Sequence, residues 1–525
     1  MNNDMQDVYR LAKPRKKGLL HLIFSRFFVI VLLLVAQILL TISFYSWLKN
    51  LFPFFSAFTV LFTLFGIIYL FNSGMDSAAR LTWMFIIAIV PITGVAFLSF
   101  TQTNVGHRKL QRRVQEMIDA TANAIAQPPE AMEKLADDVC GTDDLVKYLN
   151  KSGCFPVFDQ TEVTYFPLGE DKFIAMLEEL KKAEKFIFME YFIIDEGYMW
   201  GKILQILIEK AQAGVDVRVM YDGMLEVSTL PSNYCRLLQD HGIQAKAFSP
   251  IRPVISSHYN YRDHRKILVI DGKVAFNGGV NLADEYINRR ERFGHWKDVA
   301  VMLKGDAVKS FTLMFLQMWN VTETDAPAFQ PWLADTGYVP ESPSGFVIPY
   351  GDCPLDEDKV GESVYMDILN RAGSYVHIMT PYLILDGELE TAIRFAARRG
   401  VDVKLILPGI PDKKLAFALA KSHYHRLIEA GVEIYEYTPG FVHAKVFVSD
   451  DCKAVVGTIN LDYRSLYHHF ECATYLYKTA CIPAIEQDFQ KTLSKCRRVT
   501  PESIKDEAFY YKLMGGLMQF VAPLM

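Results

Sequence analysis

The residues most capable of chemistry form one pattern that occurs twice: a histidine, a lysine two positions later and an aspartate five positions after that. The two copies are His264, Lys266 and Asp271, and His443, Lys445 and Asp450. Side chains alternate faces along a β-strand, so a histidine and a lysine two residues apart point the same way. A single copy is more often surface decoration than a site. Two copies in the same order predict one site for phosphate chemistry, built from two imidazoles and two ammonium groups.

Each copy continues, at the same offset, into a turn of small residues and an asparagine. These residues are Gly278, Gly279 and Asn281 in the first copy, and Gly457, Thr458 and Asn460 in the second. The lysines can neutralise the non-bridging oxygens of a phosphate, the asparagine amides and the Thr458 hydroxyl can donate to them, and glycine allows close backbone approach. Charge that develops in the transition state then meets preorganised donors, and the pattern requires no metal ion.

Two imidazoles can divide the work of phosphoryl transfer. One attacks phosphorus to form a phosphohistidine, and the other protonates the leaving oxygen and then activates the incoming hydroxyl. Each needs a carboxylate to fix its tautomer, and the candidates are Asp298, in His-Trp-Lys-Asp-Val, and Glu471, in His-Phe-Glu-Cys. Asp271 and Asp450 are candidates for the catalytic set, with the equally favoured alternative that each fixes the turn after its strand.

Zinc and nucleic acid are weaker interpretations of the same residues. A lysine between the histidine ligands would repel a cation, and no cysteine or third histidine stands at ligand spacing. The formal net charge of −5 gives no global basic field, and no basic stripe with interleaved aromatic residues is present. The cluster of Arg289, Arg290 and Arg292 is local and would suit lipid headgroups equally well.

The elements that must position these residues occur twice in the same order. The predicted strand, helix and strand span 185–194, 200–213 and 214–220 in the first half, and 375–384, 388–399 and 400–407 in the second. The tetrapeptide Gly-Val-Asp-Val stands at the same place in both halves, which indicates an internal duplication. This alternation predicts an α/β fold with helices packed on the faces of its sheets, and equivalent strands brought together at a pseudo-twofold axis.

The first hundred residues predict a membrane anchor. Apolar runs cover 27–47, 51–71 and 81–100, and a helix of about 20 residues spans the hydrocarbon core. The third run contains Pro91 and Gly94, which spanning helices tolerate. Basic clusters before the first run and after the third both favour the cytoplasm, which three full spans cannot satisfy, so two or three segments are expected. A cleaved signal peptide is disfavoured because further apolar runs follow.

Two other features bear on compartment and surface. The eight cysteines form no CxxC pair, and several lie in apolar runs, which favours reduced structural thiols over disulfides. The tail at 509–525 is apolar and aromatic, and it suits docking on the body or, as the less favoured alternative, insertion into a membrane interface.

The paired motifs resemble the signature of the phospholipase D superfamily, and other stretches resemble its bacterial cardiolipin synthase branch. These stretches are 165–172, 188–192, 260–266, 437–445 and 457–465. The resemblance implies a duplicated α-β-α sandwich of the phospholipase D type behind an N-terminal transmembrane anchor. It also implies a phosphatidyltransferase that needs no metal or other cofactor and converts two phosphatidylglycerol molecules into cardiolipin and glycerol.

The resemblance also implies residue roles. His264 would be the nucleophile and His443 the general acid and base, although the symmetry of the two halves leaves their order open. The phosphate would be held by Lys266, Lys445, Asn281 and Asn460, with Thr458 as an added donor. Asp298 and Glu471 would support the two histidines.

The expected organisation is an anchor at 1–106, a polar helical linker at 107–160, a first repeat at 161–335, and a second repeat with the apolar tail at 336–525. The expected partners are phosphatidylglycerol and membrane lipid rather than nucleic acid, and a homo-oligomer is compatible with the sequence. The expected location is the cell membrane, with several spans and a cytoplasmic catalytic body.

Water or serine as acceptor would instead make the chain a phospholipase D-type hydrolase or a phosphatidylserine synthase. A scaffold without turnover is disfavoured because both motifs are complete.

Overall fold

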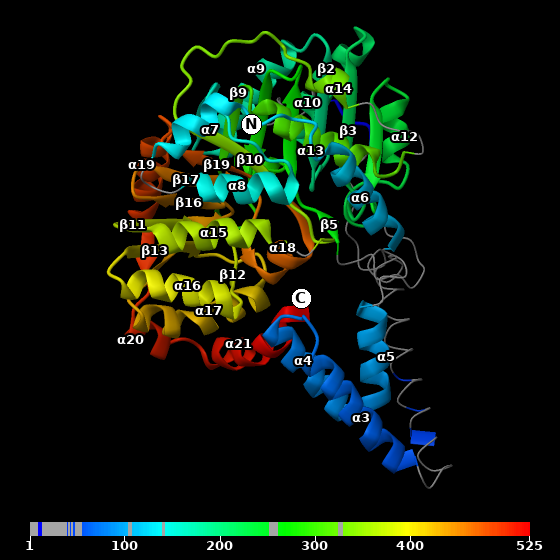
Figure 1. The fold of residues 1–525 in the computed structure, drawn as a ribbon, viewed down its shortest axis with the longest axis vertical. Coiled ribbons are helices and arrows are strands. Elements are labelled where there is room, and N and C mark those ends of the chain that lie inside the picture. Colours follow the sequence, from blue (N-terminus) through cyan, green and yellow to red (C-terminus); the bar gives the residue numbers. More distant parts are fainter. Residues whose placement is uncertain are drawn as a thin grey trace.

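The structure is a computed structural model that describes residues 9–12, 39, 43, 46–47, 55–102, 108–138, 142–250, 261–323, 329–356 and 358–524. Its body contains two α/β units that follow one another along the chain, one above the other in Figure 1. Each unit is a mixed β-sheet with helices on its faces. The predicted α/β duplication is therefore confirmed.

The first sheet has seven strands in the order β1-β9-β7-β6-β2-β3-β4. Their bounds are β1 Thr161–Phe166, β2 Phe186–Tyr191, β3 Asp216–Asp222, β4 Gln244–Phe248, β6 Lys266–Ile270, β7 Val274–Gly278 and β9 Ala300–Gly305. Strands β2, β3 and β4 are parallel, and the remaining pairs are antiparallel. Strands β2, β6 and β7 are buried at every position, which explains their nearly continuous apolar sequences.

The second sheet repeats this order as β10-β19-β17-β16-β11-β13-β14 and adds β20 at its edge. The bounds are β10 Phe346–Asp352, β11 Tyr375–Met379, β13 Asp402–Pro408, β14 Glu433–Tyr437, β16 Val446–Ser449, β17 Lys453–Gly457, β19 His469–Tyr477 and β20 Cys496–Arg498. The parallel strands are again the three that belong to the strand–helix–strand repeat. The two sheets thus correspond strand for strand.

Helices cover both sheets. Those of the first unit are α9 Gly169–Lys181, α10 Tyr198–Gln212, α11 Leu225–Ser228, α12 Tyr234–Gln239, η2 Asp284–Ile287, α13 Val308–Asn320 and α14 Gln330–Leu333. Those of the second are α15 Val360–Arg371, α16 Gly387–Arg398, α17 Lys414–Glu429, α18 Tyr463–Tyr467, α19 Ile482–Leu493 and α20 Pro501–Lys505. Gly214 and Gly400 end α10 and α16 with φ of +90° and +93°, a left-handed conformation that glycine adopts readily.

The two units share a core and exchange short strands. One buried cluster contains Phe311 and Phe315 of α13 together with residues of β6, β7, β16 and β17. Strand β5 (Arg262–Asp263) pairs in parallel with the start of β19, and β8 (His295–Lys297) pairs in parallel with β15 (Gly440–Val442). A last short pair joins β12 (Leu383–Ile384) and β18 (Leu461–Asp462) within the second unit. The seam between the units is therefore fixed by backbone pairing as well as by packing.

The region predicted as a polar helical linker forms α6 (Arg108–Thr121), α7 (Pro129–Ala136) and α8 (Thr142–Gly153). Val114 and Met117 of α6 belong to the core shared by the two units, and Leu149 of α8 belongs to the core of the second. The linker is therefore packed against the body. Cys140 lies outside the described residues, and Cys154, Cys472 and Cys481 are buried thiols in the described part of the chain.

The apolar N-terminal region forms α3 (Phe55–Phe71), α4 (Ser77–Ile89) and α5 (Pro91–Gln102), which extend away from the lower end of the body in Figure 1. The predicted run at 27–47 lies almost wholly outside the described residues. The prediction of one helix over 81–100 is wrong, because the chain leaves helical geometry at Val90 (φ −132°, ψ 74°) and starts a new helix at Pro91. Within the described part of the chain, no helix combines the length and the apolar character needed to cross a membrane.

The C-terminal segment forms α21 (Phe509–Val521) and the short η3 (Ala522–Leu524). It packs along α17 so closely that a Cβ at Gly515 would lie 2.6 Å from the Ala418 carbonyl oxygen. It also contacts α4, where Thr82 Oγ1 donates to the Phe520 carbonyl over 2.7 Å. The tail therefore docks on the body, the favoured alternative of the sequence analysis.

Candidate active site

The two predicted histidines lie in the seam, each directly after a short strand that pairs across it. The backbone N–H of His264 donates to the Phe470 carbonyl over 2.9 Å, and that of His443 donates to the Lys297 carbonyl over 2.7 Å. These bonds continue the β5–β19 and β15–β8 ladders by one residue. The backbone thus holds both imidazoles at equivalent places, one from each unit.

Each histidine is paired with a buried carboxylate of the opposite unit. His264 Nδ1 lies 2.9 Å from both carboxylate oxygens of Glu471, and His443 Nδ1 lies 2.6 Å from Asp298 Oδ2. Both carboxylates are completely buried. We assign Nδ1–H as the donor in each pair, because a buried carboxylate must receive hydrogen bonds. Nε2 of each ring is then left free to meet phosphorus or a hydroxyl.

The surroundings keep both imidazoles neutral in the free site. Burial lowers the pKa of His264 well below its usual value, and the charges of Lys266 and Lys445 lower it further. Burial and the Lys445 charge lower the pKa of His443 to about 4, against the opposing effect of Asp298. His443 also acts on His264 electrostatically, so the two motifs belong to one site. A neutral imidazole is the form that can act as a nucleophile.

Lys266 and Lys445 are almost completely buried beside the histidines. Each ammonium donates to the backbone carbonyl of the histidine two residues before it. Burial lowers the pKa of Lys266 to about 8 and that of Lys445 to about 7. Because burial disfavours the charged forms of both lysines, a bound anion such as a phosphate would stabilise them.

The two asparagines of the motif differ in how many of their side-chain atoms already have hydrogen-bond partners. Asn281 accepts from the Ile193 backbone N–H over 3.0 Å and donates to the Tyr286 hydroxyl over 2.9 Å, so it supports the turn more than it serves a phosphate. Asn460 Oδ1 has no hydrogen-bond partner among the described residues. Asn460 is therefore the better candidate for contact with substrate.

The small residues of the motif meet protein rather than phosphate. A Cβ at Gly279 would lie 2.1 Å from Asp298 Oδ1, and one at Gly457 would lie 2.3 Å from Ala473 Cβ. The Thr458 hydroxyl donates to Glu471 Oε2. In the free site these small residues therefore allow the strands and carboxylates to approach one another, and contact of the turns and Thr458 with a phosphate stays a prediction.

The aspartates that end the two motifs lie in turns at the far ends of β6 and β16. The Asp271 carboxylate accepts three backbone N–H groups over 2.7–2.8 Å, from Glu184, Lys185 and Phe186. Asp450 makes three equivalent bonds over 2.8–2.9 Å at the start of β11. Both have φ of +53°. Of the two alternatives that the sequence left open, these contacts support the structural one.

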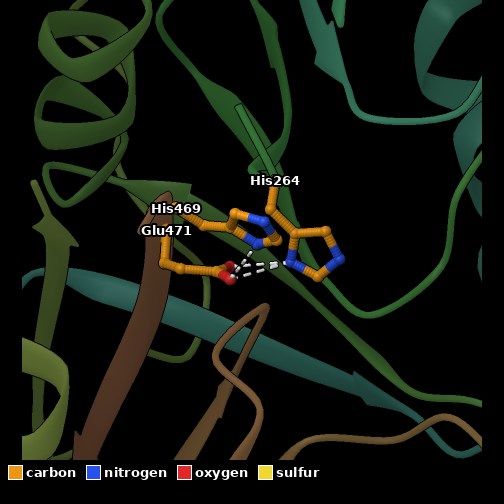
Figure 2. Close-up of side chains that lie close together, drawn as sticks. All are labelled: His264, His469 and Glu471. Atoms are coloured by element: carbon orange, nitrogen blue, oxygen red, sulfur yellow. Dashed lines mark hydrogen bonds and ion pairs between the residues drawn. The ribbon is translucent and has the colours of Figure 1, made fainter. Parts of the chain in front are cut away.

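Three residues near the site were not assigned from the sequence. Ser465 Oγ donates to Glu471 Oε1 over 2.7 Å, and the buried Lys172 Nζ donates to the Val280 carbonyl over 3.3 Å beneath the first turn. His469 lies against His264, with ring centroids 5.3 Å apart. Figure 2 shows both of these imidazoles turned toward the Glu471 carboxylate. Lys172 and Ser465 lie in stretches that resemble the family, and His469 stands two residues before Glu471 and so shares its face of the strand.

Two groups of side chains in the described residues have donor atoms close enough to share a metal ion. In the first, donor atoms of His264, His469 and Glu471 all lie within 4.8 Å of one another, but Lys266 and Lys445 beside them repel a cation. The second consists of Glu362, Asp386 and Glu388. There the Lys359 ammonium lies 3.7 Å from Glu362 and 4.0 Å from Glu388, and it already supplies a positive charge. The seam therefore suits an anionic phosphate group better than a metal ion.

Comparisons with known proteins agree with this arrangement. A family model described as "Cardiolipin synthase, PLD-like domain" matches residues 176–319 and 365–493. The cardiolipin synthase of Alkalihalophilus pseudofirmus is 32% identical over 89% of this chain and 93% of its own length. An uncharacterized protein of Streptococcus mutans is 58% identical over 88% of this chain and 99% of its own length.

Among solved structures, the phosphatidylserine synthase of Haemophilus influenzae aligns with 73% of this chain and 97% of its own. The TM-score is 0.56 at 16% sequence identity, which establishes a similar fold.

Proposed function

The chain belongs to the cardiolipin synthase family with phospholipase D-like domains, and from this premise we propose how its seam carries out a phosphatidyl transfer. The reaction joins two phosphatidylglycerol molecules into cardiolipin and releases glycerol. The observation that carries the proposal is the pair of crossed His–carboxylate contacts, His264 with Glu471 and His443 with Asp298, beside two buried lysines.

In the first step, His264 Nε2 attacks the phosphorus of one phosphatidylglycerol. The new N–P bond forms as the bond from phosphorus to the headgroup glycerol oxygen breaks. His443, whose Nε2 takes up a proton when binding of the anionic phosphodiester raises its pKa, gives that proton to the leaving oxygen. The Glu471 carboxylate accepts the Nδ1–H of the phosphatidylated His264 ring and so stabilises the positive charge of that ring. The product of this step is free glycerol.

In the second step, the free glycerol hydroxyl of another phosphatidylglycerol attacks the same phosphorus. His443 takes the hydroxyl proton, the N–P bond breaks, and cardiolipin leaves with His264 restored. Asp298 supports His443 in both directions, because it stabilises the imidazolium form. The order of the two histidines follows the family resemblance.

The lysines supply the charge that the transition state needs. Lys266 and Lys445 lie beside the two imidazoles, where they can neutralise the non-bridging oxygens. The Asn460 amide, whose Oδ1 has no hydrogen-bond partner among the described residues, can donate an N–H to the same oxygens. Preorganised donors of this kind lower the barrier because they need no reorganisation during the reaction. The chemistry proposed here uses these protein groups and no metal ion.

The substrate and the surface of the N-terminal and C-terminal helices support a membrane location. Leu81, Phe85 and Ile89 on α4, and Leu513 and Leu517 on α21, are exposed large apolar residues. The two helices meet where the Phe85 and Phe520 rings lie 4.8 Å apart, so their exposed residues form one apolar surface. We propose that this surface faces lipid and that residues 1–106 anchor the body to the cell membrane, with the catalytic body on the cytoplasmic side.

The test is to incubate full-length, detergent-solubilised protein with phosphatidylglycerol alone in the presence of a chelator. We expect cardiolipin and glycerol in equal amounts. Phosphatidic acid without cardiolipin would mean that water is the acceptor and would make the chain a hydrolase. Phosphatidylserine formed on addition of serine, and not cardiolipin, would make it a phosphatidylserine synthase. Dependence on added divalent metal would contradict the two-histidine chemistry.

A further inference from the structure

The pseudo-symmetry of the site pairs His469 with Trp296. Strand pairing aligns Arg262 with His469 before the first catalytic histidine, and Phe441 with Trp296 before the second. Each of these two residues stands two positions before a carboxylate that supports a catalytic histidine, Glu471 or Asp298. They occupy equivalent places, but one is an imidazole and the other an indole.

Both residues pack against a catalytic imidazole in the same way. The rings of His469 and His264 have centroids 5.3 Å apart and planes inclined by 37°. The rings of Trp296 and His443 have centroids 5.5 Å apart and planes inclined by 41°. An aromatic ring at this place is therefore enough to hold the catalytic ring by packing, and a histidine offers something more.

What His469 adds is a ring nitrogen directed at the shared carboxylate. Its Nδ1 lies 3.5 Å from Glu471 Oε1, which is longer than a normal N–H···O bond, and neither of its ring nitrogens has a hydrogen bond to any residue that the structure describes. The side chain is only 7% exposed. A buried imidazole without a partner is costly, so a state of the site in which it gains one is favoured.

That state arises when His264 carries the phosphatidyl group. The ring is then a cation, and its stabilisation depends on a Glu471 carboxylate that is held in place and fully charged. Thr458, Ser465 and His264 itself already donate to this carboxylate. Hydrogen bonds in active sites are often long in the free enzyme and shorten as the reaction proceeds. By such a shortening, His469 Nδ1–H would become the fourth hydrogen-bond donor to the Glu471 carboxylate.

We propose that His469 is a positioning residue for His264, which holds Glu471 through its Nδ1–H while the phosphatidyl group is on the nucleophile. It acts through Glu471 and does not touch the substrate. The role rests on the proposed two-histidine function, and it has no counterpart at Trp296. Burial lowers the pKa of His469 to about 3, so the ring is neutral and donates without adding a positive charge beside His264.

Three replacements of His469 separate the hydrogen bond from the packing. His469→Asn keeps an amide N–H near the position of Nδ1, whereas His469→Phe and His469→Trp keep an aromatic ring and lose that donor. His469→Trp also copies the residue found in the other half. We expect the Phe and Trp variants to lower kcat about tenfold, the size of one hydrogen bond to a buried charge, and the Asn variant to stay within about threefold of the wild type. KM for phosphatidylglycerol should change by less than about twofold in all three, because substrate contacts are intact.

The pH dependence of kcat/KM is a second measurement, and a change that affected only the packing of the ring at position 469 would not alter it. The charged or titratable groups that face His264 are Glu471, Lys266, Lys445, Lys413, His443 and His469. Loss of the His469 donor concentrates the negative charge of Glu471 on His264, so the acidic limb of kcat/KM should move to higher pH in the Phe and Trp variants and stay in place in the Asn variant. Trp296→Phe is the matched control from the other half, and it should leave this limb unchanged whatever its effect on rate.

The assay counts glycerol released from phosphatidylglycerol, which reports transfer to any acceptor. It therefore works even if water replaces the second lipid, and failure of cardiolipin formation alone would not be mistaken for failure of this inference. Wild-type kcat in His469→Phe would overturn the proposal. So would an equal loss in the Asn, Phe and Trp variants, with thermal unfolding curves like that of the wild type, because only packing would then matter.

Discussion

At the scale of single residues, the site is a set of buried charges in which each group depends on its neighbours. The imidazoles at 264 and 443 occupy equivalent backbone positions, yet Glu471 receives hydroxyl donors from Thr458 and Ser465, whereas Asp298 receives the backbone N–H of Val299 over 2.9 Å. The His264 side of the site is thus the more strongly hydrogen-bonded. This difference suits a histidine that must carry a covalent phosphatidyl group.

Replacement of either catalytic histidine by alanine should lower glycerol release by about a thousandfold or more, because each step needs both a nucleophile and a proton carrier. The measurement is initial-rate glycerol release by purified variants with unchanged thermal unfolding. His423→Ala is a suitable control and should keep near-normal glycerol release, since it removes another buried histidine paired with a carboxylate, Glu390, where α17 contacts α16. Near-normal turnover in either catalytic variant would remove the two-histidine mechanism.

The buried lysines predict an alkaline limit to activity. Burial lowers the pKa of Lys445 to about 7 and that of Lys266 to about 8, so the charged forms that attract phosphate exist below these values and are lost above them. We expect kcat/KM to fall as the pH rises through this range. Bound phosphate stabilises the charged forms and raises both pKa values, so the corresponding limb of kcat should lie at higher pH. Paired profiles of kcat and kcat/KM test this, and a kcat/KM that stays flat to about pH 9 would contradict it.

At the scale of elements, the turns that end the motifs hold the site strands without taking part in the chemistry. Asp271→Asn and Asp450→Asn should lower the melting temperature and leave kcat/KM within about twofold, because each carboxylate bonds three backbone N–H groups and an amide cannot replace all of them. The effect should be larger at Asp271, which is only 5% exposed. Asp144→Asn, on the exposed side of α8, should change neither quantity. A large loss of kcat/KM at unchanged melting temperature would return these aspartates to the catalytic set.

The sequence predicted the elements well where local physical chemistry decides them. The apolar runs, together with Gly214 and Gly400 as the ends of the preceding helices, predicted strands β3 and β13. Both observed strands start within two residues of the predicted positions. Pro91 was misjudged, since proline within an apolar run is compatible with a kinked helix or with a break, and only the surrounding packing decides between them. The approach of Gly279 to Asp298 Oδ1 was not predicted, because Asp298 follows β8 and is brought to this turn only by folding of the unit.

At the scale of the whole molecule, function depends on how the two halves meet. Both carboxylates were recognised from the sequence, but their partners were not. A pattern within one half says nothing about residues of the other, and the crossed pairs span 207 and 145 positions. The parallel pairs β5–β19 and β15–β8 are too short to be recognised as strands in advance. These same pairs make the site complete only when both units are folded against each other.

The apolar surface of α4 and α21 gives the last prediction, which concerns how the whole molecule meets its substrate. If this surface lies in the membrane interface, charge on it should hinder access to lipid in a bilayer but not to lipid in solution. Leu513→Glu combined with Leu517→Glu should lower kcat/KM for phosphatidylglycerol in proteoliposomes about tenfold, because two apolar side chains no longer contribute to interfacial binding. Turnover of a short-chain, monomeric phosphatidylglycerol should be unchanged.

Phe395→Glu is the matched control, since Phe395 is 53% exposed on α16 and lies outside this surface. Equal activity of the double variant and the control on both substrates would show that α21 faces water, and equal loss on both substrates would point to damage to the body that α21 covers.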